Sequence, residues 1–395
     1  MTSHLLVLNA GSSSVKFSIW TVGSDTHQAI TLNQRGAVTD IGARARFAVA
    51  DRDGKQLAAA DGAVPGAVGT HALALQHILN WLDSKLPNVE FQAVGHRVVH
   101  GGDDYAQPVR VNAAVLADLH ALIQLAPLHQ PHSLAAIELL AAQRPGLIQV
   151  ACFDTAFHQA QPPVARRFAI PRALHEAGIK RYGFHGLSYE YLAQVLPDYL
   201  GAAADGRVIV AHLGNGASLC ALHRRHSVAT TMGFTPLDGL MMGTRCGALD
   251  PGVVLYLQRE RGMSLVQVEQ LLYHEAGLLG VSGISADIST LLKSHDPRAD
   301  EAIDLYVYRI VREIGSLAAA LGGVDALVFS GGIGENIAVI RARVCAALAW
   351  LGLHLDTTRN AANGPCISLA DSAVSAWVIA THEDEIIAQH VQHVG

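Results

Sequence analysis

The sequence predicts an α/β protein with two domains, and three observations lead to this prediction. Apolar runs typical of strands covered on both faces recur and are followed by glycine-rich turns: LLVLNAGSSS at the start, VIVAHLGNGASLCAL from residue 208 and ALVFSGGIGEN from residue 326. Helical patterns lie between them, over residues 112–125, 133–142, 299–321 and 340–351. The first two runs resemble copies of one unit about 200 residues apart, so we expect a duplicated α/β domain with a cleft between the copies.

The composition is that of an ordinary folded protein. Half of the 395 residues are hydrophobic and only 16% are charged, and the net charge of -6 argues against a surface that binds nucleic acid. The five cysteines are scattered, which favours free thiols in a reducing compartment. The first residues do not resemble a secretory signal, and no apolar stretch reaches the roughly 18 residues that span a membrane. We therefore expect a cytoplasmic protein with no membrane partner.

The first strand leads into a turn that collects hydrogen-bond donors. Residues 5–8 are apolar, residues 15–20 alternate between apolar and polar, and Asn9-Ala10-Gly11 has the chemistry of a turn. The three serines at 12–14, the backbone N–H groups and Lys16 suit an anion. A plain hairpin with a solvated lysine fits the same residues, and both interpretations stay open at this point.

Other familiar patterns are incomplete. GGIGEN at residue 331 lacks the last glycine of a dinucleotide-binding motif, and the sequence contains no Walker loop. HRVVH, with His96 and His100, has no second pair of ligands for zinc. The small-residue segments 58–69 and 201–206 are predicted loops.

Charged and histidine side chains stand where strands are expected to end. They are Arg97 in GHRVVHGG, His129 in APLHQP, Asp154 in FDTAFH, His185 in YGFHG and Arg245 in GLMMGTRCG. Each alone also fits a structural ion pair or a core histidine. Together with three glycine-rich turns they favour phosphoryl transfer, a reaction that depends on positive charge and hydrogen-bond donors.

These motifs, in this order and over essentially the whole chain, resemble the acetokinase family. The resemblance rests on VLNAGSSSVKFSIW, GHRVVHGG, LAPLHQP, FDTAFH, YGFHGLS, AHLGNGASLCA, FTPLDGLMMGTRCGALDPG, GVSGISADI and FSGGIGEN. It implies duplicated ribonuclease H-like domains of the actin-like ATPase kind with a central cleft. The N-terminal domain would comprise residues 1–152 and 385–395, and the nucleotide-binding domain residues 153–384.

The resemblance also implies which residues hold the nucleotide and the metal. The first phosphate motif would use Asn9, Ser12, Ser14 and Lys16, and the second His212, Leu213, Gly214, Asn215 and Gly216. The adenosine side would use Asp287, Gly332, Ile333, Gly334 and Asn336. Asn9 and Glu383 would lie at a Mg²⁺ ion, which Mn²⁺ could replace.

The implied reaction is transfer of the ATP γ-phosphate to acetate, giving acetyl phosphate and ADP, in a homodimeric enzyme. Arg97, Arg245 and His185 would stabilise the transferring group, Asp154 would orient magnesium or substrate, and His129 would support the site. Val99, Leu128, Phe184 and Pro236 would enclose the methyl group. A propionate or other short-chain acyl kinase is the alternative, and a butyrate kinase, a sugar or glycerol kinase and a non-enzymatic nucleotide switch are further rivals.

The chain departs from the family pattern in four places. Ser289 stands where an arginine usually lies beside the adenine, so we expect weaker selection of the base. GLSY follows the catalytic histidine in place of GTSH, Ala248 replaces an acid, and THED replaces TNEE.

Overall fold

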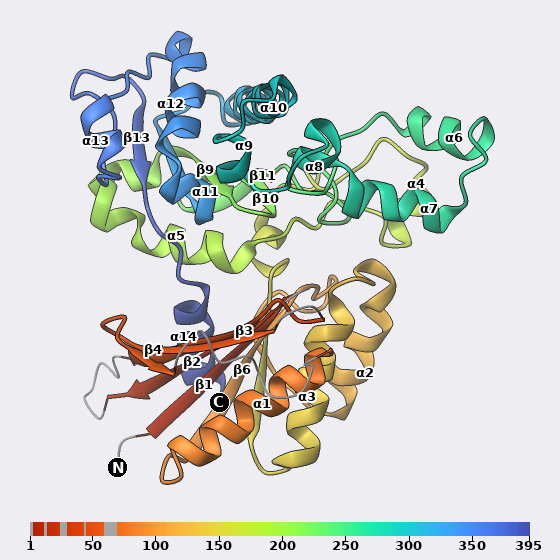
Figure 1. The fold of residues 1–395 in the computed structure, drawn as a ribbon, viewed down its shortest axis with the longest axis vertical. Helices are drawn as coiled ribbons and strands as arrows, with labels where there is room; N and C mark the ends of the chain where they lie inside the picture. Colours follow the sequence, from red (N-terminus) through yellow and green to blue (C-terminus); the bar gives the residue numbers. More distant parts are fainter. Residues whose placement is uncertain (1–2, 12–13, 24–29, 43–44, 59–68) are drawn as a thin grey trace. The chain divides into compact units, whose positions relative to one another are not determined.

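The computed structural model describes residues 3–11, 14–23, 30–42, 45–58 and 69–395, and it divides into two compact units (Figure 1). One unit contains residues 1–156 and 382–395, and the other contains residues 157–381. The sequence placed the boundaries after residue 152 and before residue 385. Those positions fall inside β8 (Ile148–Phe153) and α14 (Glu383–Val394), whereas the observed boundaries fall within the 3₁₀-helix η2 (Ala156–Ala160) and just before α14.

The first unit is an eight-stranded sheet with helices. Its strand order is β5-β4-β3-β2-β1-β6-β8-β7. The strands are β1 (Ser3–Ala10), β2 (Val15–Val22), β3 (Ile30–Thr39), β4 (Arg46–Asp51), β5 (Gln56–Ala58), β6 (Phe91–Val98), β7 (Val109–Arg110) and β8. The helices are α1 (His71–Lys85), α2 (Ala113–Ala121), the 3₁₀-helix η1 (Leu122–Leu125), α3 (Gln130–Gln143) and α14.

The second unit has a five-stranded sheet in the order β11-β10-β9-β12-β13. Its strands are β9 (Arg207–Leu213), β10 (Ala217–His223), β11 (His226–Thr230), β12 (Ala326–Ser330) and β13 (Ser375–Val378). Its α-helices are α4 (Arg172–Glu176), α5 (Gly186–Leu200), α6 (Pro251–Arg259), α7 (Leu265–Gln270), α8 (Gly277–Ser282), α9 (Ile288–Leu291), α10 (Pro297–Leu321), α11 (Gly331–Asn336), α12 (Ala338–Ala347) and α13 (Thr357–Ala361). Shorter helical turns are η2 (Ala156–Ala160), η3 (Gly201–Asp205), η4 (Leu271–Glu275) and η5 (Ala349–Leu351).

The two sheets share one topology. In the first unit β3-β2-β1 form an antiparallel meander, and β6 and β8 continue parallel to β1. In the second unit β11-β10-β9 form the same meander, and β12 and β13 continue parallel to β9. The predicted α/β fold class is confirmed, and the repeated strand order is the arrangement that an internal duplication would leave.

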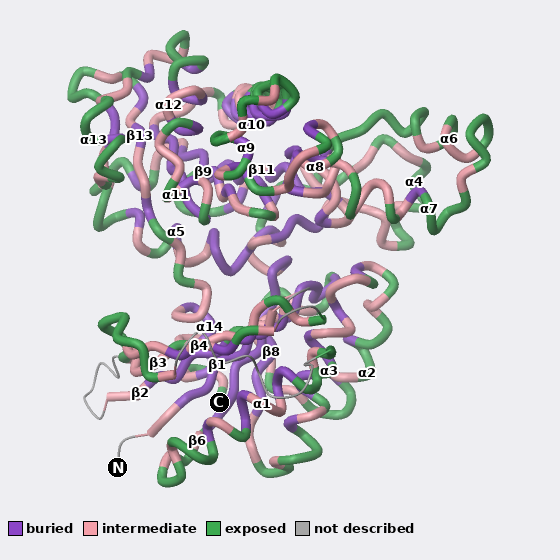
Figure 2. The backbone as a smooth tube through the Cα atoms, in the orientation of Figure 1, coloured by how far each residue is buried: buried purple, intermediate pink, exposed green. Residues whose placement is uncertain are grey.

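Burial on both faces explains the apolar character of the central strands (Figure 2). Helices α1 and α3 pack on one face of the first sheet and α14 packs against β1 and β6. The contact with α14 requires Gly95, because a Cβ atom there would lie 2.4 Å from Cγ2 of Ile387. The C-terminal helix is therefore part of the core of the first unit.

The predicted helices are present, with boundaries set by their caps. Residues 299–321, for example, belong to α10, which begins at the N-cap Asp296 followed by Pro297 and ends at Gly322 in a left-handed conformation. Three local expectations were wrong. Asn9 and Ala10 belong to β1, so the turn starts at Gly11; residues 331–336 form α11; and residues 201–205 form a 3₁₀-helix. The predicted loop at 58–69 lies almost wholly outside the described residues.

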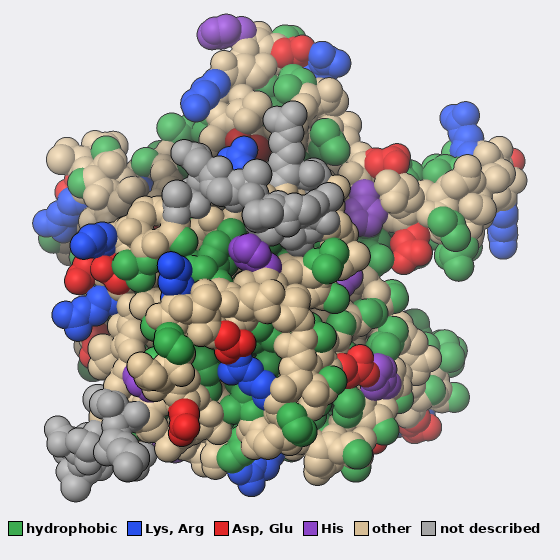
Figure 3. Space-filling model, turned by 60° about the horizontal axis from the view of Figure 1, so that its bottom comes forward, with side chains coloured by type: hydrophobic (Ala, Val, Ile, Leu, Met, Phe, Trp, Pro, Cys, Tyr) green, Lys and Arg blue, Asp and Glu red, His purple; other side chains and the backbone are tan. Residues whose placement is uncertain are grey.

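The described surface mixes charges of both signs, and Figure 3 shows lysine and arginine interspersed with aspartate and glutamate on one face. Within the described ranges, none of the helices has the length and apolar character needed to cross a bilayer.

Candidate active site

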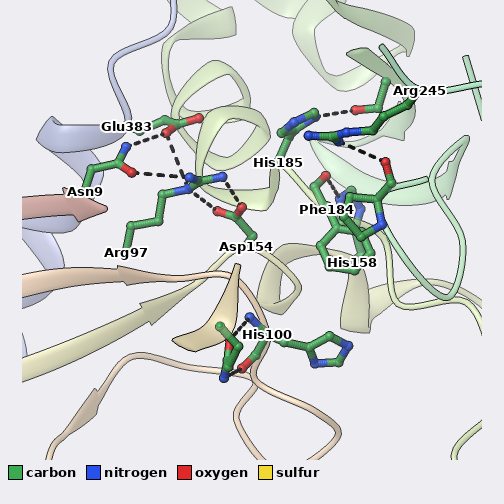
Figure 4. A network of polar contacts seen from close by, with 12 residues as sticks. Asn9, Arg97, His100, Asp154, His158, Phe184, His185, Arg245 and Glu383 are labelled. Carbon is green, nitrogen blue, oxygen red and sulfur yellow. Dashed lines mark hydrogen bonds and ion pairs between the residues drawn. The ribbon is translucent and has the colours of Figure 1, made fainter. Parts of the chain in front are cut away.

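Arg97 is the centre of a polar cluster in the first unit (Figure 4). It stands near the end of β6, and its Nε and Nη2 both donate to the carboxylate of Asp154, the first over 2.9 Å. Its Nη1 donates to Oδ1 of Asn9 over 3.3 Å, and its Nε lies 3.8 Å from Oε2 of Glu383. The Nδ2 group of Asn9 donates to the same Glu383 oxygen over 3.4 Å. Four of the predicted site residues are therefore brought together.

Three elements of the first sheet supply this cluster. Asn9 is the next-to-last residue of β1, Arg97 lies on the adjacent parallel strand β6, and Asp154 follows the next strand, β8. Carboxyl ends of parallel strands meet at one edge of a sheet, so these side chains gather although they are far apart in sequence. The Asp154 N–H also donates to the carbonyl of Val98 over 3.1 Å, which fixes the start of the loop.

Burial and the neighbouring charges together set the electrostatics of the cluster. The Asp154 side chain is 1% exposed and that of Arg97 18%. Burial raises the pKa of Asp154 to about 6, with Arg97 opposing the shift and Glu383 adding to it. For Arg97, burial disfavours the charge, but Asp154 and Glu383 outweigh that effect and raise its pKa above the ordinary value. Arg97 is therefore a fixed cation at neutral pH.

The serine-containing hairpin follows the expected strand, turn and strand. Its turn is closed by the Gly11 N–H donating to the carbonyl of Ser14 over 2.8 Å, and Lys16 lies opposite Asn9 on β2. Ser12 lies outside the described residues. Lys16 is exposed, and its charge favours the ionised form of Asp384, whose pKa is raised by burial and by Glu383. Asp384 is an acid that the sequence analysis did not single out.

The second unit gathers a different set of cationic and donor groups. His185 precedes α5, and its ring lies with its centroid 4.6 Å from that of His212 on β9. A Cβ atom at Gly216 would lie 3.4 Å from Nε2 of His185 and 3.7 Å from Nη1 of Arg245. The second phosphate motif, residues 212–216, is therefore flanked by both side chains.

Glycines let the neighbouring backbones approach this motif. A Cβ at Gly243 would lie 2.3 Å from Oδ1 of Asn215, and the Gly243 N–H donates to the Asn215 carbonyl over 3.2 Å. Gly331 has a φ of 75°, and a Cβ there would lie 2.7 Å from the carbonyl oxygen of Leu213. The Gly214 N–H donates to Gly216 O over 3.1 Å. The turn after β9, the loop before Arg245 and the start of α11 are thus packed together.

The position of His185 depends on an unusual backbone. It has φ 59° and ψ 25°, a left-handed conformation that non-glycine residues rarely adopt. The preceding residue is anchored by His158, whose Nε2–H donates to the carbonyl of Phe184 over 2.9 Å. His158 is fully buried, which lowers its pKa to about 4, and its Nδ1 lies 2.9 Å from the Ser227 hydroxyl. The neutral His158 therefore fixes the loop that carries His185.

The residues expected at the adenosine lie on two short helices. Gly332, Ile333, Gly334 and Asn336 belong to α11, where Gly332 is exposed and Asn336 Nδ2 donates to Gly332 O over 2.9 Å. Asp287 is the N-cap of α9, because its Oδ2 accepts from the N–H of Thr290 over 2.9 Å. One carboxylate oxygen of Asp287 is therefore already used to hold its own helix.

The residues expected around the acyl group are divided between the two units. In the first unit Val99 is buried directly after β6, while Leu128 and His129 are half-buried before α3, with His129 as its N-cap. In the second unit Phe184 and Pro236 are buried, and the Pro236 carbonyl accepts from Nη1 of Arg245 over 3.0 Å. Arg245 is thereby tied to one of the predicted pocket residues.

The oxygen atoms near Arg97 suit magnesium only in part. Glu383 and Asn9 offer carboxylate and amide oxygens, the hard ligands that Mg²⁺ prefers. Among the described residues, no three or more His, Cys, Asp and Glu side chains are arranged to hold a metal ion. Mg²⁺ is often bound by one or two carboxylates together with nucleotide phosphates. The residues therefore fit an ion that arrives with the nucleotide.

Sequence reasoning missed the residues that act behind the site. Ser218 contacts His185 directly, and Tyr189 contacts Ser218 from behind. His158 holds the loop that carries His185. Ser218 follows the second phosphate motif and His158 ends FDTAFH, so both lay within quoted motifs. Their role depends on contacts between distant strands and helices, and only the structure reveals those.

Comparisons with known proteins show the family of this chain. The model of the acetokinase family matches residues 4–389. The chain is 56% identical to an acetate kinase of Rhodopseudomonas palustris, covering 99% of this chain and 98% of the relative, and 48% identical to an acetate kinase of Rhizobium meliloti, covering 98% and 97%. Among solved structures, it is similar to a propionate kinase of Francisella tularensis (36% identity, TM-score 0.89, complete coverage of both chains) and to the Porphyromonas gingivalis acetate kinase (35%, 0.84, 99% of both). The chain belongs to the acetokinase family.

Proposed function

We propose that this protein is an acetate kinase, which reversibly transfers the γ-phosphate of ATP to acetate and forms acetyl phosphate and ADP. The observation that carries the proposal is the fixed guanidinium of Arg97, held by Asp154 and Asn9 at the carboxyl edge of the first sheet. Such a cation suits a carboxylate substrate and a phosphoryl group that would otherwise repel each other.

The acceptor needs no general base. Acetate has a pKa near that of a side-chain carboxyl, about 4, so it is already an anionic nucleophile at neutral pH. Asp154 supports this interpretation, because both of its oxygens accept hydrogen bonds from Arg97. We therefore assign Asp154 to positioning Arg97 and not to proton abstraction, and the transfer is a direct in-line displacement.

Arg245 and His185 would stabilise the transferring phosphoryl group from the second unit. Both flank Gly216 of the second phosphate motif, where the donors could reach the equatorial oxygens of the transition state. A magnesium ion, which manganese could replace, would neutralise charge on the nucleotide phosphates, with Glu383 and Asn9 as its protein ligands. His129 would support the acyl side, next to Leu128.

The size of the acyl group is the second question. Val99, Leu128, Phe184 and Pro236 would form a pocket that fits the methyl group of acetate. Propionate is the second candidate substrate, because a propionate kinase is among the similar structures. One methylene changes discrimination by only about 1–3 kcal/mol, so propionate should be a poorer substrate and not an excluded one.

The decisive experiment is acyl-hydroxamate formation by the purified protein with Mg-ATP. Acetate, propionate and butyrate would be tested separately, with glycerol as the control for a hydroxyl acceptor. We expect the strongest signal with acetate and a weaker one with propionate. Signal with the longer acids alone would keep acyl phosphate synthesis and contradict the pocket, whereas no acyl phosphate with any acid would contradict the kinase.

The biological setting belongs to the same proposal. We propose that the enzyme acts in the cytoplasm as a homodimer and that neither nucleic acid nor membrane takes part in the reaction. Light scattering of the purified protein would measure the oligomeric state directly.

A further inference from the structure

A buried chain of hydrogen bonds leads from the second sheet to the ring of His185. Nδ1 of His185 lies 2.8 Å from Oγ of Ser218 on β10, and the same oxygen lies 2.5 Å from the hydroxyl of Tyr189 on α5. Ser218 and Tyr189 are both fully buried. His185 is the N-cap of α5 and Tyr189 lies in the first turn of this helix, and both side chains reach Ser218 on β10.

The direction of these hydrogen bonds can be deduced by accounting for each proton. The Ser218 hydroxyl is the partner that the structure gives to the Tyr189 hydroxyl, and a buried phenol that donates to nothing is costly. Tyr189 should therefore donate to Ser218. Burial also raises the pKa of Tyr189 well above its ordinary value, so the phenol keeps its proton. Ser218 then has its own hydrogen left, and Nδ1 of His185 is the acceptor within reach.

The opposite direction, with His185 donating to Ser218, leaves one hydrogen-bond donor without an acceptor. If Nδ1 of His185 carried the proton, it would donate to Ser218. In one arrangement the Ser218 hydroxyl would then donate to Tyr189, and the buried hydroxyl hydrogen of Tyr189 would have no acceptor. In the other arrangement His185 and Tyr189 would both donate to Ser218, and the hydroxyl hydrogen of Ser218 would have no acceptor. Each arrangement leaves one buried O–H unsatisfied, at a cost comparable to a lost hydrogen bond.

We propose that Tyr189 and Ser218 are positioning residues that set the tautomer of His185. In this arrangement Nδ1 accepts from Ser218 and the ring proton stays on Nε2. Nε2 is the nitrogen on the side of Gly216 and of Arg245, where the phosphate is expected. This chain of hydrogen bonds, from Tyr189 through Ser218 to His185, is called the relay below. It presents an N–H donor and not a lone pair to the negatively charged phosphate oxygens. The kinetic effects expected below rest on the proposed phosphoryl transfer, whereas the tautomer of His185 does not depend on it.

The first test is a spectroscopic one on the unmodified protein. Histidine ¹⁵N spectra distinguish protonated from unprotonated ring nitrogens, and the His185 signals can be assigned as those missing from His185→Gln. At about pH 8, where an ordinary histidine is neutral, we expect Nδ1 of His185 to be unprotonated and Nε2 to be protonated. A proton on Nδ1 would overturn the proposal, whether or not the variants below fold and whether or not the protein makes acetyl phosphate.

The second test uses Tyr189→Phe and Ser218→Ala. We expect Tyr189→Phe to lower kcat about tenfold, the effect of one hydrogen bond, to leave the KM values for ATP and acetate within about twofold, and to move part of the ring proton to Nδ1. Because both residues act through one ring, the double variant should lose little more than Ser218→Ala alone.

Tyr306→Phe is the matched control. Tyr306, on α10, is also fully buried, and burial raises the pKa of its phenol. Its hydroxyl, however, has no hydrogen-bond partner among the described residues. We expect its removal to leave kcat and the His185 signals unchanged. Equal effects of Tyr189→Phe and Tyr306→Phe, or additive effects of the two relay variants, would contradict the relay.

Discussion

At the scale of single residues, the two arginines owe their positions to different partners. Arg97 is held by two carboxylates and an amide, whereas Nη1 of Arg245 donates to a backbone carbonyl, that of Pro236. Charge-assisted hydrogen bonds of this kind fix the direction of a guanidinium at little further entropic cost. Both side chains are therefore pre-organised before substrate binds.

We predict that Arg97→Ala or Arg245→Ala removes about 3–4 kcal/mol of transition-state stabilisation, a loss of about 10²–10³ in kcat. The reason is that each cation would face the negative charge that develops on the transferring phosphoryl group. Steady-state kinetics with Mg-ATP and acetate measure the loss. Arg225→Ala is the control, because Arg225 forms an exposed ion pair with Asp205. A loss below tenfold would remove either arginine from the mechanism.

The Val99 side chain should set the acyl preference. We predict that Val99→Ala raises the ratio of kcat/KM for propionate to that for acetate by about tenfold, because it makes room for one methylene. Val98→Ala is the matched control, since Val98 is also buried but belongs to a hydrophobic cluster with residues of β8, α2 and α3. An unchanged ratio in Val99→Ala would show that this residue does not line the acyl pocket.

At the scale of elements, α11 depends on a buried arginine. Arg341, on α12, is fully buried, and its Nη1 donates to the carbonyls of Gly334 and Glu335 over 2.8 and 3.0 Å. Its Nε and Nη2 donate to Asn360, over 2.8 Å to the side chain and 2.7 Å to the carbonyl. The guanidinium thus satisfies the last carbonyls of the helix expected at the adenosine.

We predict that Arg341→Met lowers the free energy of unfolding by about 2–4 kcal/mol, because several buried carbonyls lose their donor. It should also raise the KM for ATP, since α11 is no longer held. Urea denaturation and kinetics measure the two effects. Arg343→Met, two residues away on the same helix with a partly exposed ion pair to Asp304, should change neither. Equal behaviour of the two variants would contradict the role of Arg341.

Helix α9 carries the serine that replaces the family arginine. Asp287 caps this helix, and Ser289 lies half-buried in its first turn. We predict that ATP and GTP are used with kcat/KM values within about tenfold of each other, because one base contact is missing. Ser289→Arg should increase the preference for ATP. A strong preference for ATP in the unmodified enzyme would show that other residues select the base.

At the scale of the whole molecule, buried histidines make stability depend on pH. His96, His100 and His158 are buried, and burial lowers the pKa of each to about 4. The unfolded chain, with histidine pKa values near 6.5, binds more protons between pH 4 and 6.5. The free energy of unfolding therefore falls as the pH decreases through this range, and Asp154, whose pKa is raised to about 6, opposes part of the loss.

We predict that the protein loses about 2 kcal/mol of stability per buried histidine at about pH 5 relative to neutral pH, and that Asp154 opposes part of this loss. Urea denaturation at the two pH values measures the difference. His158→Gln should reduce the pH dependence, whereas His223→Gln, at an exposed position, should not. Equal unfolding free energies at both pH values would contradict the prediction.

Local sequence patterns determined the fold class and most of the elements. Continuous apolar runs marked β1, β9 and β12, because strands buried on both faces are apolar at most of their positions. The glycine-rich motifs pointed to turns, but the helix over residues 331–336 was missed, because glycine suits a turn and the start of a helix alike. The same motifs indicated the phosphate chemistry, since the donors and the turn are neighbours in sequence.

Only the tertiary structure decided which polar groups meet. Asn9 and Glu383 are 374 residues apart and Arg97 and Asp154 are 57 apart, yet all four share one network. The parallel strands and the returning C-terminal helix bring them together, and no local pattern encodes these pairings. The tautomer of His185 is a further example, because it depends on Ser218, which lies 33 residues away on β10. The sequence by itself determined the two α/β units and the candidate chemistry. The packing of the strands decided how each charge and proton is held, because hydrogen bonds and ion pairs depend on distance in space.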